Sequence, residues 1–231
     1  AIGATYDAYV PMDNFLGGDY TINADLLYSR DHNAAIITRR DLVVDSTGPA
    51  GFPIYDSVNS PGTLELTNTD VEAESLNLSF TVAKDYDFGL DWIFGYAYTD
   101  AEDVQPMTSS VAYSNYTSRA FVGANDEIAA RSNYNIENRF TLNVNYGREF
   151  FQGYETRFSL FALASSGRPY SYTMSANGGG DLTFFNPYLS GDNWLLYVPT
   201  GPSDPNVDLS AIDADAFFQD RKSTRLNSSH L

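Results

Sequence analysis

Large apolar residues alternate with small or polar residues along two stretches of the chain, residues 88–99 and 136–147. In the first stretch the even-numbered residues are Phe88, Leu90, Trp92, Phe94, Tyr96 and Tyr98. A period of two residues indicates a β-strand whose two faces meet different surroundings. At about 3.3 Å per residue and a tilt of about 40–45°, roughly eleven such residues rise about 25 Å, the height of the apolar band of a membrane-spanning barrel. The pattern therefore predicts strands that are long enough to cross a bilayer.

Three further stretches, residues 20–28, 75–82 and 154–163, show the same alternation, which is least regular in the last of them. We therefore expect six strands between Ala1 and Met174. One of them is predicted to be a single long strand over residues 19–44, bulged near residues 31–33. A tight hairpin at residues 30–33 is the alternative interpretation.

The segments between the predicted strands are alternately short and long. The short ones are residues 11–18, 84–87 and 148–153, and the long ones are residues 45–61, 100–135 and those from 167 onward. This alternation is typical of the periplasmic turns and extracellular loops of outer-membrane barrels. The predicted fold class is therefore all-β: a partial transmembrane antiparallel β-barrel, formed as an open curved sheet of about six long strands with long extracellular loops.

The last residues, Asp220–His230, resemble a one-frame translation of a synthetic sequencing adapter. We therefore expect residues 220–231 to be an artefact and exclude them from fold reasoning. Residues 1–219, which do not begin with Met, are expected to be a piece of the barrel domain of a longer protein. Without the tail the chain has 29 acidic and 10 basic residues and a net charge of −19.

Composition excludes several classes of function. The strong negative charge argues against nucleic acid as a partner. The absence of cysteine excludes disulfides and thiolate metal sites. The most apolar run, Phe158–Ala164, is far shorter than the roughly 20 residues that a spanning helix needs. The 17 Tyr and 15 Phe suit the aromatic girdles of a membrane barrel, although they would also suit a soluble β-sandwich.

The sequence offers little that indicates catalysis or metal binding. Once His230 is set aside with the tail, His32 is the remaining histidine, and we expect it to be a solvated loop residue rather than a ligand or an acid–base group. Without a partnered histidine, no Ser-His-Asp arrangement can be proposed. We therefore expect no enzyme activity, no catalytic, cofactor-binding or metal site, and no cofactor, and the substrate-binding residues are unknown.

Three loop features have a functional interpretation that we consider weaker than the structural one. Two groups of loop carboxylates could bind calcium but lack EF-hand spacing, so we expect solvated acidic loops. The two groups are Asp100, Glu102 and Asp103, and Asp204, Asp208, Asp213 and Asp215. Gly178–Gly180 lacks the Lys-Ser/Thr that follows a phosphate-binding loop, and Asn115–Thr117 fits a glycosylation sequon only formally.

Charged residues at odd-numbered strand positions should lie on the face opposite the large apolar residues. On a barrel this face lines the lumen, where the charges would be wet, paired or in contact with an internal plug. These residues are Asp25, Asp91, Glu137, Arg139, Glu155 and Arg157.

Four separated phrases resemble, in order, the β-barrel of Oar-like TonB-dependent transporters. They are Tyr96–Ala112, Asn138–Leu142, Ser166–Thr173, and Leu195–Gly201 followed by Asp204 and Pro205. Leu27–Ala34 is also similar to an extended strand of that family. The resemblance covers most of residues 19–219.

The resemblance implies an outer-membrane receptor of about twenty-two strands, closed by an N-terminal plug and energised by the TonB complex. The expected partners are therefore outer-membrane lipid, the TonB complex through a plug outside this sequence, and an unidentified bulky solute. No residue that contacts TonB or a substrate is carried over, because this sequence contains neither a plug nor a TonB box. The alternatives are a non-energised outer-membrane porin or adhesin and, less favoured, a secreted soluble β-protein that binds carbohydrate.

Overall fold

A computed structural model describes residues 2–10, 19–48, 51–57, 62–174, 193–206 and 213. These residues form antiparallel β-structure with one short helix, and they divide into two compact units. The first unit contains residues 1–32, 72–103 and 131–169, and the second contains the remainder. The adapter-like tail, residues 220–231, and the Gly178–Gly180 run lie outside the described residues.

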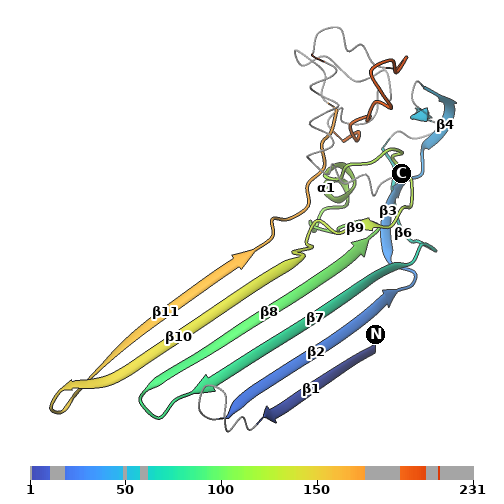
Figure 1. Ribbon diagram of the computed structural model, residues 1–231. Helices are drawn as coiled ribbons and strands as arrows, with labels where there is room; N and C mark the ends of the chain where they lie inside the picture. The colour runs from blue at the N-terminus through green and yellow to red at the C-terminus, as the bar shows by residue number, and fades with distance from the viewer. Residues whose placement is uncertain are drawn as a thin grey trace. The chain divides into compact units, whose positions relative to one another are not determined.

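The first unit is built on one large sheet (Figure 1). Its strand order is β1-β2-β7-β8-β10-β11, with the short strand β9 (Ala130–Arg131) paired to β8. The six long strands are β1 (Ile2–Val10), β2 (Tyr20–Asp31), β7 (Ala73–Asp85), β8 (Leu90–Asp103), β10 (Asn138–Phe151) and β11 (Tyr154–Ser165). Five of them have 12 to 14 residues, about twice the usual length of a strand in a globular protein. The prediction of an open sheet of about six long antiparallel strands is confirmed, whereas the expected total of six strands between Ala1 and Met174 is wrong, because the described residues there form eleven.

The register of the large sheet places even-numbered residues opposite even-numbered residues, except at the irregularity after Glu149, where Phe151 lies opposite Tyr154. Ala24 lies opposite Phe80, Phe80 opposite Tyr96, Tyr96 opposite Phe140, and Phe140 opposite Ala164. Because direct cross-strand partners project to the same side, one face collects all of these residues. The alternation that predicted the single strands therefore also determines how they align.

We call this side the apolar face. It consists of Ile2, Ala4, Tyr6 and Ala8 of β1; Tyr20, Ile22, Ala24, Leu26 and Tyr28 of β2; Leu76, Leu78, Phe80 and Val82 of β7; Leu90, Trp92, Phe94, Tyr96 and Tyr98 of β8; Phe140, Leu142, Val144 and Tyr146 of β10; and Phe158, Leu160, Ala162 and Ala164 of β11. The opposite side, the polar face, carries mainly Thr, Ser, Asn, Asp, Arg and Gly, with Leu27, Ile93, Phe161 and Leu163 as exceptions.

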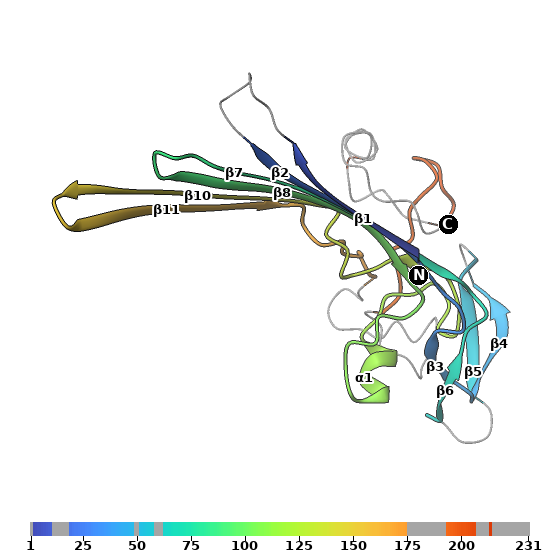
Figure 2. The same ribbon diagram turned by 90° about the horizontal axis from the view of Figure 1, so that it is seen from below.

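In the described part of the chain, the large sheet does not close. Strands β1 and β11 each pair on one side only, so the sheet has two open edges. Viewed nearly edge-on, β7, β8, β10 and β11 form a single layer (Figure 2). None of the helices among the described residues has the length and hydropathy that a membrane-spanning helix requires.

The prediction of one strand over residues 19–44 is wrong, and so is the hairpin alternative. Strand β2 ends at Asp31, and Asn33 has a φ of 56°, a left-handed conformation that Asn tolerates better than most residues. The chain then forms β3 (Ala35–Arg39), which pairs with β6 (Leu64–Asn68) rather than with β2. In β3 the neighbouring residues Ile36 and Ile37 are both buried, so the two-residue period is lost.

Further structure lies in segments that the sequence analysis left as loops. Strand β4 (Leu42–Thr47) pairs with β5 (Pro53–Ser57), and most of this pair falls in the segment expected to be a loop at residues 45–61. Helix α1 (Ala112–Thr117) lies within the second long segment. The second unit has its own apolar core, formed by Ile37, Leu42, Phe52, Tyr55, Tyr116, Phe121, Ala124 and Trp194.

Trp194 lies at the centre of that core. The rings of Phe121, Phe52 and Tyr55 surround it, with centroid distances of 5.1, 6.1 and 6.5 Å. Aromatic pairs at such distances each stabilise a fold by about 0.5–1.5 kcal/mol beyond the area they bury. The long segments of the second unit are thus held together by packing that links residues far apart in the sequence.

Candidate functional site

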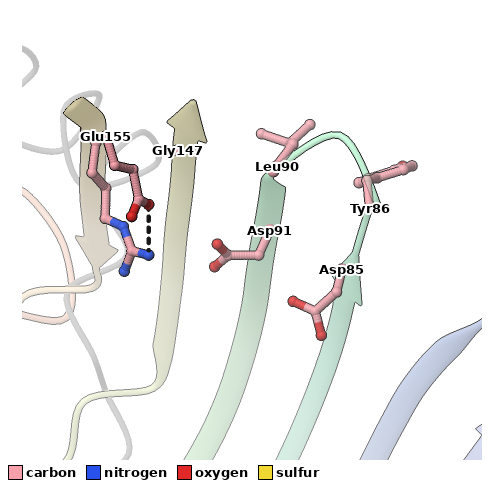
Figure 3. Close-up of a pocket in the computed structure, with 8 residues that line it drawn as sticks. Asp85, Tyr86, Leu90, Asp91, Gly147 and Glu155 are labelled. Atoms are coloured by element: carbon pink, nitrogen blue, oxygen red, sulfur yellow. Dashed lines mark hydrogen bonds and ion pairs between the residues drawn. The ribbon is translucent and has the colours of Figure 1, made fainter. Parts of the chain in front are cut away.

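A small hollow opens on the polar face at the turn end of β7, β8, β10 and β11 (Figure 3). Its lining residues are Asp85, Tyr86, Gly89, Leu90, Asp91, Gly147, Glu155 and Arg157. All of them belong to the first unit. The cavity volume is about 180 Å³, below the roughly 300–1,000 Å³ of pockets that enclose a drug-sized ligand. The hollow therefore accommodates a small group or a side chain but not a bulky solute.

Two glycines provide the room for this hollow. Gly89 has a φ of +90°, and a Cβ atom there would lie 2.1 Å from the carbonyl oxygen of Gly147. The Gly147 N–H donates a hydrogen bond of 2.9 Å to the Gly89 carbonyl oxygen. A Cβ atom on Gly147 would in turn lie 2.9 Å from Oε1 of Glu155. The Gly89 backbone approaches that of Gly147 closely because Gly89 has no side chain, and the absence of a side chain on Gly147 leaves room for Glu155.

The walls of the hollow carry three carboxylates and one guanidinium group. Asp85 and Asp91 are direct cross-strand partners, an arrangement in which like charges repel. Asn145 donates a hydrogen bond of 2.7 Å to Asp91, and Arg157 donates one of 3.3 Å to Glu155 (Figure 3). The net negative charge suits a cationic group. The lining includes no Ser, Thr, Cys or His that could serve as a nucleophile or a histidine base.

The other charged residues predicted for this face are also partnered in several cases. Asp25 accepts a hydrogen bond of 2.9 Å from the Ser79 hydroxyl. Glu137 lies 3.5 Å from Arg131. The sequence therefore predicted the polar-face positions of Asp25, Asp91, Arg139, Glu155 and Arg157, whereas Glu137 precedes β10. Asp25, Asp91, Glu137, Glu155 and Arg157 each have a polar partner.

The apolar face is a second surface of functional interest, because much of it is exposed. The relative exposure is 78% for Ile2, 66% for Tyr6, and 59% and 60% for Phe158 and Leu160. Soluble monomers seldom expose a contiguous apolar patch larger than a few hundred Å². An apolar face that extends over six strands is unfavourable in contact with water, so we expect an apolar partner to cover it.

Aromatic residues gather toward both ends of this face. At the turn end, Tyr86 packs on Phe88 with a centroid distance of 5.1 Å, and Phe150 packs on Tyr146 and Phe158 at 6.5 and 6.2 Å. Toward the loop end, Tyr96 packs on Phe140 at 4.8 Å.

The structure places His32 at an exposed position beside Glu72. Its side chain is exposed, and Nδ1 lies 2.8 Å from a carboxylate oxygen of Glu72, which also pairs with Arg30 at 3.1 Å. Such an exposed pair contributes little to stability. The expected solvated position is confirmed.

The carboxylates considered for calcium are not brought together in the described residues. No cluster of three or more His, Cys, Asp or Glu side chains there could hold a metal ion. Asp204 instead accepts hydrogen bonds from the Thr200 and Asn206 backbone amides, at 2.7 and 2.9 Å, and from the Tyr197 hydroxyl at 2.8 Å. These bonds lower its pKa, with the Thr200 amide as the largest cause. Asp208 and Asp215 lie outside the described residues.

The sequon at Asn115 has a structural role in the second unit. The Asn115 side chain accepts a hydrogen bond from the Ser109 amide at 2.7 Å and donates one to the Ser109 carbonyl oxygen at 2.6 Å. The next residue, Tyr116, is fully buried, and this burial raises its pKa. Arg119 lies between the rings of Tyr116 and Phe121, 5.6 Å from each, and burial lowers its pKa.

Sequence reasoning missed the hollow, although part of its signal was present. Asp91, Glu155 and Arg157 were assigned to the polar face from their odd-numbered positions. Gly89 and Gly147 are odd-numbered too, and a glycine on a face lined by charged residues indicates a close backbone approach. Comparison with known proteins finds no family model, curated protein or solved structure that matches this chain.

Proposed function

We propose that this chain forms part of the membrane-spanning wall of an outer-membrane β-barrel. The single observation that carries the proposal is the apolar face, which runs without interruption across six long strands in one register. Lipid chains are an apolar covering that fits strands of this length, because a transmembrane strand needs about 9–11 residues. Backbone groups in a bilayer must be paired, so the two open edges would be joined to further strands.

On this proposal the polar face lines the barrel lumen and the long loops lie outside the cell. Short turns join β7 to β8 and β10 to β11 at one end, and the long connection from β8 to β10 lies at the other. This arrangement matches the turns and loops of outer-membrane barrels. The acidic hollow then faces the lumen near the periplasmic end.

The more specific function that we propose is energised transport of a bulky solute by a TonB-dependent receptor of the Oar-like type. The support for this step is the resemblance of the four separated phrases in residues 96–205. Of the residues in those phrases, Tyr197 packs against the core of the second unit, whereas the core residues Tyr116, Phe121 and Trp194 lie between the phrases. A non-energised porin or adhesin would share the membrane wall but would not need TonB.

A pair of charge substitutions in the full-length protein tests the membrane step. Lysine at Phe94 would lie in the apolar face, whereas lysine at Asn143 would lie on the polar face of the neighbouring strand. We expect Phe94→Lys to lower the free energy of unfolding in vesicles by about 2–4 kcal/mol, and Asn143→Lys to change it by less than about 1 kcal/mol. Denaturant titration measures both. Equal losses would contradict the proposal.

Cross-linking in cells tests the transport step separately. The full-length protein should cross-link to TonB, and removal of the segment that precedes the barrel should abolish the cross-link while membrane insertion is retained. A protein that inserts normally but never cross-links to TonB would be a non-energised barrel.

A further inference from the structure

At the turn end of the large sheet, the acidic strand residues lie on the polar face together with one basic residue, Arg157, which pairs with Glu155. The acidic strand residues there, Asp85, Asp91, Glu149 and Glu155, are odd-numbered and lie on the polar face. The even-numbered charged residues in the same region are both basic, Lys84 and Arg148. The whole chain has 30 acidic and 13 basic residues. A border of the apolar face where the charged residues are all basic is therefore the opposite of what the overall composition would give.

The two cations lie near the turn end of the apolar face, just before its turn-side aromatic residues Tyr86 and Phe150. Along the described strands, no residue of the apolar face between them and the loop end is charged. The first charged even-numbered residues at the loop end of β2 and β7 are Arg30 and Glu74, which pair with each other at 2.5 Å. Lys84 and Arg148 have no such acidic partner among the described residues, so the two borders differ in charge.

Lys84 occupies an aromatic cage at this border. Its side chain is 2% exposed, and Nζ lies 4.3 Å from the ring centroid of Tyr20 and 4.8 Å from that of Tyr86. Nζ has no hydrogen-bond partner among the described residues. Two rings offset part of the cost of burying an ammonium group, but its three N–H donors still need an acceptor.

Arg148 is the second basic residue at this border, and it lies in β10 near the turn to β11. Its side chain is exposed, and one Nη1 contact of 3.5 Å reaches the Tyr146 hydroxyl. Exposed aromatic residues, Phe150, Tyr154 and Phe158, belong to the same hairpin. A guanidinium group binds phosphate through paired hydrogen bonds, whereas a lysine acts as a compact charge on a flexible stem that can extend toward the membrane surface.

We propose that Lys84 and Arg148 bind the headgroup phosphates of anionic phospholipids at the turn-side border of the apolar face. This inference rests on the proposed membrane location, because only acyl chains on the apolar face would bring headgroups to this border. We favour a lipid headgroup over free phosphate as the ligand, because the two cations adjoin the apolar face rather than the charged hollow. Lys84 Nζ is enclosed by the Tyr20 and Tyr86 rings, so on this proposal its flexible stem moves out of the cage to give the ammonium group the acceptor that it lacks.

The test uses the full-length protein in vesicles of phosphatidylcholine that contain a minor fraction of phosphatidylglycerol. Native mass spectrometry then counts the phosphatidylglycerol that remains bound after release in mild detergent. We expect Lys84→Met and Arg148→Met each to reduce this retention about fivefold, and the double variant to reduce it further. Arg139→Met removes a cation from the polar face and is the matched control, which should retain lipid as the original protein does.

Three outcomes would overturn the inference. The original protein could retain phosphatidylglycerol no better than phosphatidylcholine, or Arg139→Met could reduce retention as much as Arg148→Met. Release of the lipid by inorganic phosphate would show a site for free phosphate instead. Arg148 is exposed, so its variant tests binding without disturbing a buried cage. A protein that inserts but shows no headgroup preference refutes only this inference, whereas failure to insert refutes the membrane proposal itself.

Discussion

Two glycines with similar backbone conformations lie in different surroundings at the turns of the large sheet. Gly89 has a φ of +90° and faces the Gly147 carbonyl oxygen, whereas Gly153 has a φ of +81° and open space around it. Alanine at either position meets the strain of a left-handed conformation, about 1–2 kcal/mol. We expect Gly89→Ala to lower the free energy of unfolding by at least about 1 kcal/mol more than Gly153→Ala, because a Cβ at Gly89 displaces backbone.

Denaturant titration of the two glycine variants in the full-length protein measures this difference. Equal losses would mean that the close approach of Gly89 and Gly147 does not constrain the fold. The hollow on the polar face would then need another explanation.

Asp204 should make the turn at residues 200–206 sensitive to acid. Its pKa is lowered in the folded state by the hydrogen bonds that its carboxylate accepts, first from the Thr200 amide. The stabilisation is therefore complete above the ordinary carboxyl pKa of about 4 and is lost as the pH falls through the lower folded value. The amide resonance of Asn206 should shift only when the pH falls well below the ordinary carboxyl pKa of about 4, because the folded pKa of Asp204 is lowered. In Asp204→Asn, which cannot titrate, an unchanged acid shift would contradict this assignment.

At the scale of elements, alternation predicted the strands whose two faces differ and failed where both faces are covered. Strands β8 and β10 show a regular two-residue period and were predicted closely. Strand β3 was not predicted as a separate strand. Its sequence neighbours Ile36 and Ile37 are both buried, so it has no two-residue period. The break after β2 depends on one left-handed residue, Asn33, and on pairing with β6, which lies about thirty residues further along. Such distant pairing leaves no local signal.

The connection between β3 and β4 depends on a buried ion pair. Arg39 and Asp41 lie 2.5 Å apart with side-chain exposures of 6% and 2%, and Asp41 also accepts a hydrogen bond from the Gly62 amide at 3.0 Å. Asp41→Ala leaves the guanidinium group buried without its carboxylate, so we expect a loss of about 3–5 kcal/mol in the stability of the second unit. Hydrogen exchange of the β3 and β4 amides reports this loss.

The neighbouring Arg40 provides the control for that experiment. It is exposed and lies 3.7 Å from Glu65, so Arg40→Ala should cost no more than about 1 kcal/mol. Similar protection of the β3 and β4 amides in both variants would contradict a special role for the Arg39–Asp41 pair.

At the scale of the whole molecule, the proposal assigns the loops and turns to opposite sides of the outer membrane. An epitope tag inserted between residues 104 and 129 of the full-length protein should therefore be labelled by antibody on intact cells. A tag in the turn at Gln152–Gly153, between β10 and β11, should be labelled only after permeabilisation. Reversed accessibility would invert the proposed orientation while leaving the two faces of the sheet unchanged.

The central claim is that the apolar face of the large sheet meets lipid. A nitroxide scan of residues 90–99 in β8 tests it most directly, with the full-length protein in vesicles and with oxygen and a water-soluble nickel complex as relaxation agents. Labels at even-numbered positions should be relaxed by oxygen, which concentrates in the bilayer. Labels at odd-numbered positions should be relaxed less by oxygen, so that accessibility to oxygen alternates with a period of two residues. Even-numbered labels that neither agent reaches would place these residues in a dry protein core and contradict the account.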